Sequence, residues 1–96
     1  MDVNEAGSIL QQQIRLLRQK SYSELKEFVD HRVIQDLEIV GASGTRYQVE
    51  VEAFWDTKKR DNIRVLASID DGRIRTFIHP LTRSFIKAPD GSFVGE

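Results

Sequence analysis

The stretch Tyr47 to Trp55 reads YQVEVEAFW, and it decides the fold of this chain. Successive side chains of an extended strand point to opposite faces, so the stretch has two distinct sides. One side carries Tyr47, Val49, Val51, Ala53 and Trp55. The other side carries Gln48, Glu50, Glu52 and Phe54. One apolar and one mainly polar side are typical of an antiparallel sheet that is covered on one face.

Composition limits the class of protein. The chain has 96 residues, with 14 Lys and Arg, 15 Asp and Glu, and no Cys. This length suits a single α+β domain, residues 1–96, with one core. The net charge of -1 means that the whole chain has no excess of positive charge with which to bind nucleic acid. Without Cys, thiolate nucleophiles and cysteine zinc sites are excluded.

The N-terminus is acidic and lacks the basic and apolar regions of a signal peptide. Apolar runs such as 53–55 and 65–67 are only three residues long, too short to span a membrane. We therefore expect a cytoplasmic protein that makes no membrane contact.

A first helix is predicted from about Ile9 to Gln19, with residues 1–7 frayed. Ser8 and Gln11 have the spacing of a capping box, in which each side chain satisfies the other residue's backbone N–H. The apolar residues that follow recur at helical spacing and comprise Leu10, Ile14 and Leu17.

A second helix is predicted from Tyr22 to about His31. Ser21 and Glu24 form its capping box. A new cap directly after the first helix requires the chain to turn near Lys20.

Three strands follow, at Ile34 to Val40, Tyr47 to Trp55 and Ile63 to Asp70. Each alternates apolar and polar residues. The turn 41–44 (GASG) and the polar loop Asp56 to Asp61 join them.

Asp71-Gly72 predicts a tight hairpin, because such turns need positive φ. This hairpin would pair Ile69 with Ile74 and place Leu66 opposite Phe77.

The tail is expected to contain a turn or 3₁₀ piece around Leu81 to Ser84. The apolar pairs 85–86 and 93–94 flank APDG at 88–91, which predicts a small closing hairpin. The predicted fold is two N-terminal helices on one face of a four- to five-stranded antiparallel meander sheet.

Several motifs carry a resemblance. The segments YQVEV at 47–51, FWD at 54–56, DDG at 70–72 and FIKAPDGSFV at 85–94 are similar to those of a group of small uncharacterised bacterial proteins. The similarity covers most of the chain after about residue 21. It implies a bacterial, stand-alone protein, and it implies no activity, ligand or site residue.

No catalytic or metal site is expected. His31 and His79 lack metal-ligand spacing. The turn 41–44 is flanked by predicted strands, whereas a phosphate loop opens a helix. Glu50 and Glu52 share a strand face, where cross-strand ion pairs with Arg64 and Arg75 explain them better than acid–base catalysis. We expect no enzyme activity, no cofactor and no metal.

Two surfaces remain as candidate binding sites. Phe54, Leu66 and Phe77 fall at outward positions, where an apolar cluster usually marks a partner surface. The competing interpretation is that Phe85 and Phe93 fold over them as a second small core. The basic candidates for a nucleic-acid site are Lys58, Lys59, Arg60, Arg64, Arg73 and Arg75.

The sequence favours a small non-enzymatic interaction or regulatory module. It would bind a protein, or itself as a homodimer, through the outer sheet face or an edge strand. The alternative is a nucleic-acid-binding accessory protein that uses the basic hairpin tip and exposed arginines, although nucleic acid is not the expected partner.

Overall fold

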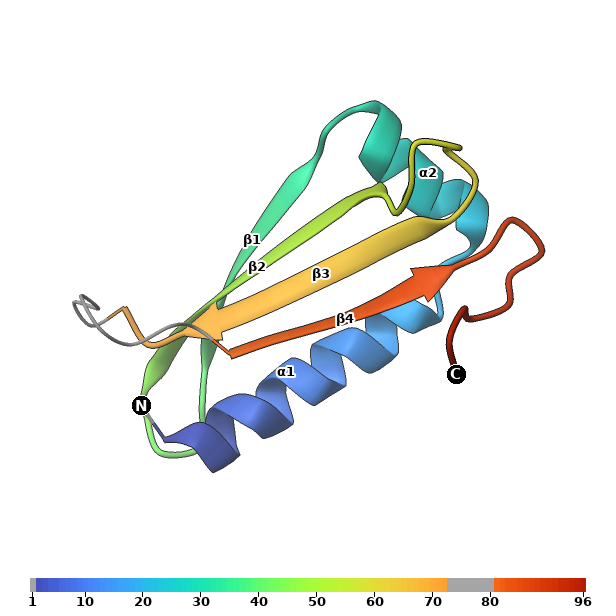
Figure 1. Ribbon diagram of the computed structural model, residues 1–96. Coiled ribbons are helices and arrows are strands. Elements are labelled where there is room, and N and C mark those ends of the chain that lie inside the picture. Colours follow the sequence, from blue (N-terminus) through green and yellow to red (C-terminus); the bar gives the residue numbers. More distant parts are fainter. Residues whose placement is uncertain (1, 73–80) are drawn as a thin grey trace.

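The computed structural model describes residues 2–72 and 81–96. Two helices precede a four-stranded antiparallel sheet, in which the strands lie side by side in chain order (Figure 1). The elements are α1 (Val3–Arg18), α2 (Tyr22–Asp30), β1 (Ile34–Val40), β2 (Arg46–Trp55), β3 (Ile63–Asp70) and β4 (Leu81–Lys87). The predicted α+β class and meander are therefore confirmed.

The core lies between the helices and one face of the sheet, the inner face. α1 packs on β3 and β4, whereas α2 packs on β2 and β3. The side chains predicted to point inward from β3 are all buried, and Tyr47 of β2 is fully buried as well. Trp55, by contrast, is only half-buried. The buried core comprises Ala6, Leu10, Ile14, Leu17, Leu25, Tyr47, Val49, Val51, Ile63, Val65, Ala67, Ile69 and Phe85.

The first helix begins earlier than the sequence analysis predicted. Asp2 is the N-cap, and its carboxylate accepts a hydrogen bond from the Glu5 backbone N–H. Ser8 is therefore an exposed residue inside α1, and the expected fraying of residues 1–7 is wrong for Val3 to Gly7. Two contacts stabilise the helical residues that precede the predicted start. Ala6 is buried, and the Glu5 carboxylate accepts hydrogen bonds from the β1–β2 turn.

The second helix begins as predicted. The Ser21 hydroxyl accepts from the Glu24 N–H at 3.1 Å, and the Glu24 carboxylate accepts from the Ser21 N–H at 3.0 Å. This capping box fixes the corner between α1 and α2.

The partner of β3 differs from the prediction. Ile69 pairs with Leu81, and Leu66 pairs with Ser84, so the tight hairpin at Asp71-Gly72 with Leu66 opposite Phe77 is wrong. The segment expected as a turn at Leu81 to Ser84 is the first half of β4. Its register puts Phe85 opposite Val65 on the inner face, where the ring is buried. Burial of this aromatic ring outweighs the local turn signal.

The closing hairpin of the tail is confirmed. The Ala88 N–H bonds the Ser92 carbonyl, and Lys87 bridges to Phe93 in antiparallel fashion. The Val94 N–H also bonds the Ile86 carbonyl at 2.9 Å. The tail therefore occupies the end of the β4 edge.

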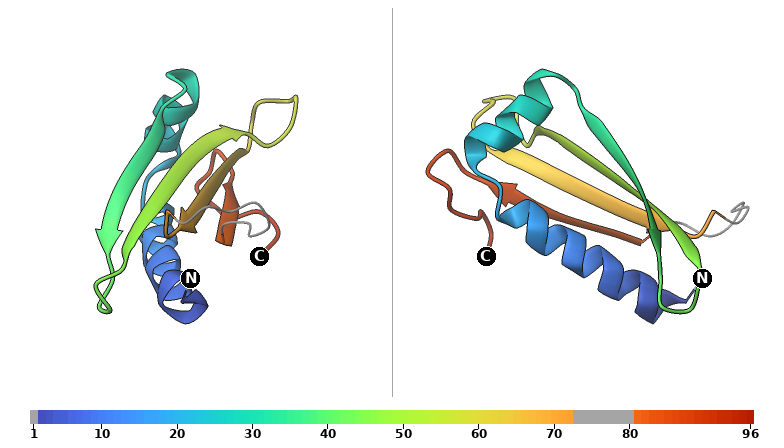
Figure 2. Two further views of the ribbon diagram at one scale, coloured as in Figure 1. Left: turned by 90° about the vertical axis from the view of Figure 1, so that its left-hand side faces the viewer. Right: turned by 180° about the vertical axis from the view of Figure 1, so that it is seen from behind.

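The two edges of the sheet differ in how they are covered. Figure 2 shows the twisted sheet, with β1 on the side away from β4 and α1 beneath the β3–β4 side. β1 packs mainly on β2, whereas the β4 side contacts both α1 and the C-terminal hairpin. β1 is thus the more open edge.

Candidate functional site

Four of the apolar side chains that the described residues place on the outer face of the sheet, the face away from the helices, lie near the Phe54 end of β2. Phe54 is directly opposite Arg64, and Leu66 is opposite Glu52, so these two apolar side chains are diagonal neighbours on β2 and β3. Diagonal neighbours are within reach of an aromatic side chain. Ile34 on β1 and Ile86 on β4 extend this group on either side. We call Ile34, Phe54, Leu66 and Ile86 the outer patch.

The predicted apolar cluster of Phe54, Leu66 and Phe77 is found in part. Phe54 and Leu66 lie on the outer face as predicted, whereas Phe77 lies outside the described residues. Phe85 is on the inner face, and Phe93 packs edge-on against it with ring centroids 5.8 Å apart. The interpretation in which Phe85 and Phe93 cover the outer face is therefore wrong, and Phe54 remains 39% exposed.

A hollow lies beside Phe54, where β2 extends past the start of β1. The register of the two strands ends at Ile34 opposite Glu52, so residues 53–55 have no β1 partner. The hollow measures about 280 Å³ and is lined by Val29, Arg32, Val33, Ile34, Glu52, Ala53, Phe54 and Trp55. Ile34 at its rim is 56% exposed. The volume suits one or two apolar side chains of a partner.

Sequence reasoning missed Ile34. Its outward direction could have been read from the alternation, because Asp36 and Glu38 on the same strand also point outward. The hollow itself had no signal in the sequence, because it depends on how far β2 extends past β1.

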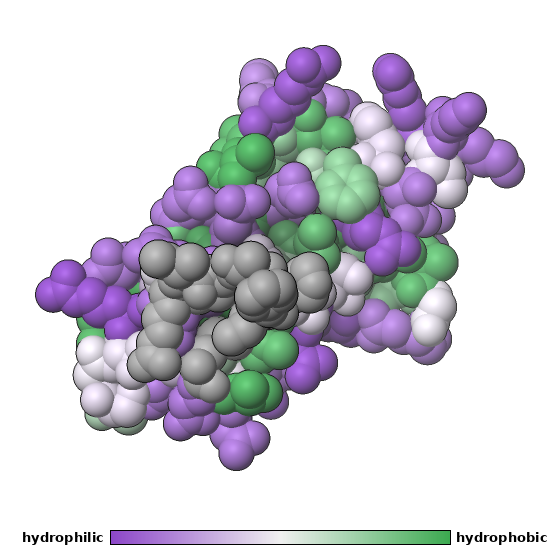
Figure 3. Space-filling view, turned by 60° about the vertical axis from the view of Figure 1, so that its left-hand side comes forward, coloured by the Kyte–Doolittle hydropathy of each residue, from purple (hydrophilic) through white to green (hydrophobic). Residues whose placement is uncertain are grey.

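Charged side chains interrupt the outer patch. In Figure 3 purple surface divides the green surface into separate areas. Arg64 lies between Phe54 and Ile86, and it bonds the Asp56 carboxylate at 3.0 Å and the Ser84 hydroxyl at 3.1 Å. The outer patch is therefore a set of apolar anchors separated by polar side chains.

Carboxylates dominate the remainder of the outer face. The register places five of them there, namely Asp36, Glu38, Glu50, Glu52 and Asp70. The predicted ion pairing of Glu50 and Glu52 with Arg64 is wrong, because Arg64 bonds Asp56 and Ser84 instead. The cation predicted on the neighbouring strand, Arg75, lies outside the described residues.

The predicted basic residues do not form one surface in the described part of the chain. Lys58, Lys59 and Arg60 are exposed in the loop between β2 and β3. Arg64 is engaged by Asp56, and Arg73 and Arg75 lie outside the described residues. A phosphate backbone that followed this loop onto the sheet would meet the carboxylates of the outer face.

His31 is the histidine that the structure describes, and its side chain contacts α2. The His31 imidazole lies 3.0 Å from the Glu27 carboxylate, one helical turn away. Among residues 2–72 and 81–96, no three potential ligand side chains of the His, Cys, Asp or Glu type gather into a metal-binding group. His79 lies outside these residues.

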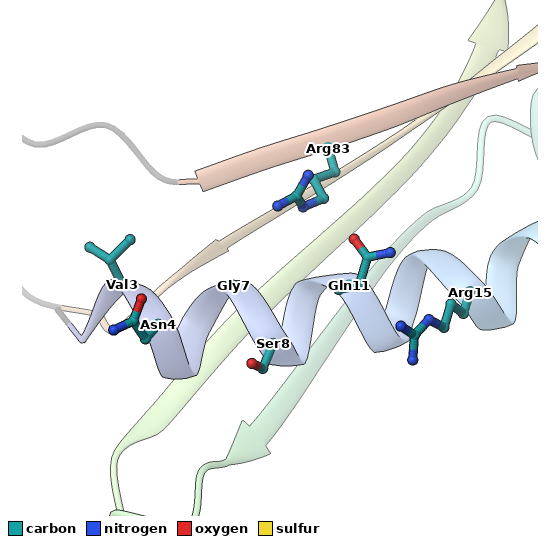
Figure 4. A pocket seen from close by; sticks show the side chains of 7 residues that line it. All are labelled: Val3, Asn4, Gly7, Ser8, Gln11, Arg15 and Arg83. Carbon is teal, nitrogen blue, oxygen red and sulfur yellow. The ribbon is translucent and has the colours of Figure 1, made fainter. Parts of the chain in front are cut away.

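A second hollow, of about 490 Å³, follows α1 beside β4. Gln11 and Arg83 project into the space between the two elements, whereas Arg15 points away from β4 (Figure 4). The two guanidinium groups of this hollow, from Arg15 and Arg83, lie among amide and hydroxyl groups and offer no nucleophile or base. The lining of this hollow is mainly polar, whereas the lining of the one beside Phe54 is mainly apolar.

No helix in the described ranges is both long and apolar enough to cross a membrane. Comparison of the chain with family models, curated proteins and solved structures finds no match. What the fold and site define is a small α+β protein with an exposed, partly apolar sheet face.

Proposed function

We propose that this chain is a non-enzymatic interaction module that binds a protein through the outer patch and the hollow beside Phe54. The observation that carries the proposal is the exposure of Phe54 and Ile34 at the rim of an apolar hollow. Exposed apolar surface beside a hollow is typical of a partner site, because burial of apolar area contributes about 25 cal/mol per Å².

The arrangement of the outer patch supports specific recognition. Apolar anchors give affinity, while the polar groups between them penalise partners that leave those groups unpaired. Glu52 lies between Ile34 and Leu66, so a partner that buries both side chains also has to satisfy a carboxylate.

The contacts of two described serine hydroxyls support a role other than catalysis. The Ser92 hydroxyl bonds Asp90 within the tail turn, and the Ser84 hydroxyl accepts from Arg64. Both contacts hold the local structure, whereas a nucleophile needs a base that is free to take its proton.

The test compares three variants with the wild type. Phe54→Lys and Leu66→Lys each place a charge in the outer patch, whereas Val3→Lys places the same charge at the start of α1, where Val3 is 58% exposed. All three should keep the wild-type circular dichroism spectrum. Light scattering after size exclusion, at low and high salt and with or without nucleic acid, measures self-association and complex formation.

We expect Phe54→Lys and Leu66→Lys to lose the salt-insensitive dimer or protein complex that the wild-type chain forms, while Val3→Lys keeps it. Equal binding by all four proteins would contradict the proposal. A salt-sensitive complex with nucleic acid, unaffected by Phe54→Lys, would favour the accessory-protein alternative.

A further inference from the structure

The free edge of β1 offers backbone groups for pairing. The Gly41 N–H bonds the Thr45 carbonyl across the β1–β2 turn. Paired and unpaired positions alternate along an antiparallel ladder, so the N–H and C=O of Ile34, Asp36 and Glu38 point away from β2. These are the groups to which an added strand would bond.

The opposite edge of the sheet is less open. At the end of β4, the Ile86 carbonyl already accepts a hydrogen bond from Val94, and Lys87 bridges to Phe93. β1 has no such covering segment among the described residues, since it packs mainly on β2. It also lacks Pro and Lys, two residues that commonly block edge strands.

Below β1, the helices leave apolar side chains half-covered. Leu37 and Ile39 point to the inner face but are only half-buried, because α1 packs on β3 and β4 instead. A hollow of about 540 Å³ opens at the Ile39 end of β1, between this strand and the Ser8, Ile9 and Gln12 side of α1. An added strand would send every second side chain into this space.

Above β1, charge decides which strand can be accepted. Asp36 and Glu38 lie at the edge on the outer face, with Glu50 directly behind Asp36. Two arginines that the described residues place on this face already have partners, since Arg46 lies 3.7 Å from Glu38 and Arg64 lies 3.0 Å from Asp56. Cations at the outward positions of an added strand would therefore meet carboxylates.

The same charges disfavour a second copy of this chain at β1. Antiparallel pairing of two β1 strands about Leu37 would bring Asp36 opposite Glu38. Like charges directly opposite each other destabilise a strand pair. Pairing between two β1 strands is therefore disfavoured, whereas pairing with a basic strand is not. Like-charge repulsion thus makes the edge selective.

We propose that β1 binds an extended protein segment that alternates basic and apolar residues, with the basic side chains over Asp36 and the apolar ones beneath Leu37 and Ile39. This inference rests on the proposed function and names the partner's chemistry, since Ile34 belongs both to β1 and to the outer patch.

The test uses three synthetic peptides, acetylated and amidated, against the full chain. One is an eight-residue peptide of alternating Lys and Val, one alternates Glu and Val, and one has four Lys followed by four Val. Fluorescence anisotropy measures affinity, and hydrogen exchange by NMR measures protection of each β1 amide. Asp36→Lys reverses the edge charge, and Glu27→Lys makes the same change on exposed α2.

We expect the alternating Lys–Val peptide alone to bind, and the amides of Asp36 and Glu38 to become protected. Those of Leu37 and Ile39 are already bonded to β2 and should change little. Asp36→Lys should weaken binding at least about tenfold, a change of about 1.4 kcal/mol, while Glu27→Lys leaves it unchanged.

Failure to bind this peptide, equal binding of the Glu–Val or block peptide, or protection of Asp36 by dimerisation of the free chain would overturn the inference. Partner binding that depends on Phe54 but leaves the β1 amides unprotected would overturn it too, while leaving the proposed function intact. Loss of binding by Phe54→Lys with no effect of Asp36→Lys would have the same meaning.

Discussion

Asp36 lies directly opposite Glu50 in the β1–β2 ladder. The alternation of the ladder makes this a non-hydrogen-bonded pair, in which opposite side chains are closest. Two carboxylates at such a position repel each other, so this pair lowers the stability of the folded state. A surface kept for binding a basic partner would explain this cost.

The pair gives a first prediction. Glu50→Gln should raise the free energy of unfolding by about 0.2–1 kcal/mol, because it removes the repulsion. Urea denaturation at low salt measures the gain, which should shrink at high salt through screening.

Asp56→Asn is the matched control, because Asp56 pairs with Arg64 at 3.0 Å. It should not stabilise the chain. If Glu50→Gln destabilised the protein at low salt, the interpretation of Asp36 and Glu50 as an unfavourable pair would be wrong.

A second prediction separates two serines with the same sequence signature. Ser21→Ala should lower the free energy of unfolding by about 1 kcal/mol, since it removes the N-cap of α2. Ser8→Ala should leave stability within about 0.5 kcal/mol, because Ser8 is exposed inside α1. Chemical denaturation of both variants measures the difference, and equal losses would contradict the helix start at Asp2.

Glu5 gives a prediction on pH. Hydrogen bonds from the Ser43 hydroxyl, the Tyr47 hydroxyl and the Ser43 N–H hold the pKa of Glu5 below its ordinary value of 4.5. A lowered pKa in the folded state contributes stability above the unfolded pKa, and this is lost as the pH falls through the folded value. The urea midpoint should therefore fall less between pH 6 and pH 3 in Glu5→Gln than in the wild type.

The pKa of Tyr47 is shifted in the opposite direction. Burial, and then its hydrogen bond to Glu5, raises the pKa of Tyr47 from 10.0 to about 12. The folded state then holds this proton more tightly than the unfolded state, so stability should fall as the pH rises from about 10 to about 12. The same titration on Tyr47→Phe should show a smaller alkaline loss, and an identical loss would contradict the assignment.

Lys87 gives a prediction for the corner between the helices. Its buried ammonium donates to the carbonyl oxygens of Arg18 at 3.1 Å and Lys20 at 2.6 Å. Lys87→Met keeps an unbranched side chain as far as Cε but leaves these carbonyls without their donor, which should cost about 1–3 kcal/mol. Thermal unfolding measures the loss, and an unchanged midpoint would mean that water replaces the ammonium.

Local signals predicted most of the fold, and long-range contacts decided the remainder. The alternation of β2 and β3 and the capping box at Ser21 were readable because each depends on residues close in sequence. The register of β4 was not, because it depends on burying Phe85 opposite Val65, twenty residues away. The start of α1 likewise depends on contacts of Glu5 with the distant turn at Ser43.

The candidate site was predicted in part for the same reason. Strand alternation placed Phe54 and Leu66 on the outer face. It could not show that Ile34 borders a hollow, because the end of β1 relative to β2 is a tertiary feature. The assignment of Arg64 to Glu50 and Glu52 failed because Asp56, eight residues before Arg64 in the sequence, bonds it instead.

The most direct measurement of the central claim is photo-crosslinking in the cells that produce this chain. A benzoylphenylalanine side chain at position 54 should form a protein adduct of higher mass, whereas the same group at position 3 should form none. Adduct formation at position 54 should disappear when Leu66→Lys is added. Adducts at position 3 alone, or at neither position, would contradict a binding site on the outer face of the sheet.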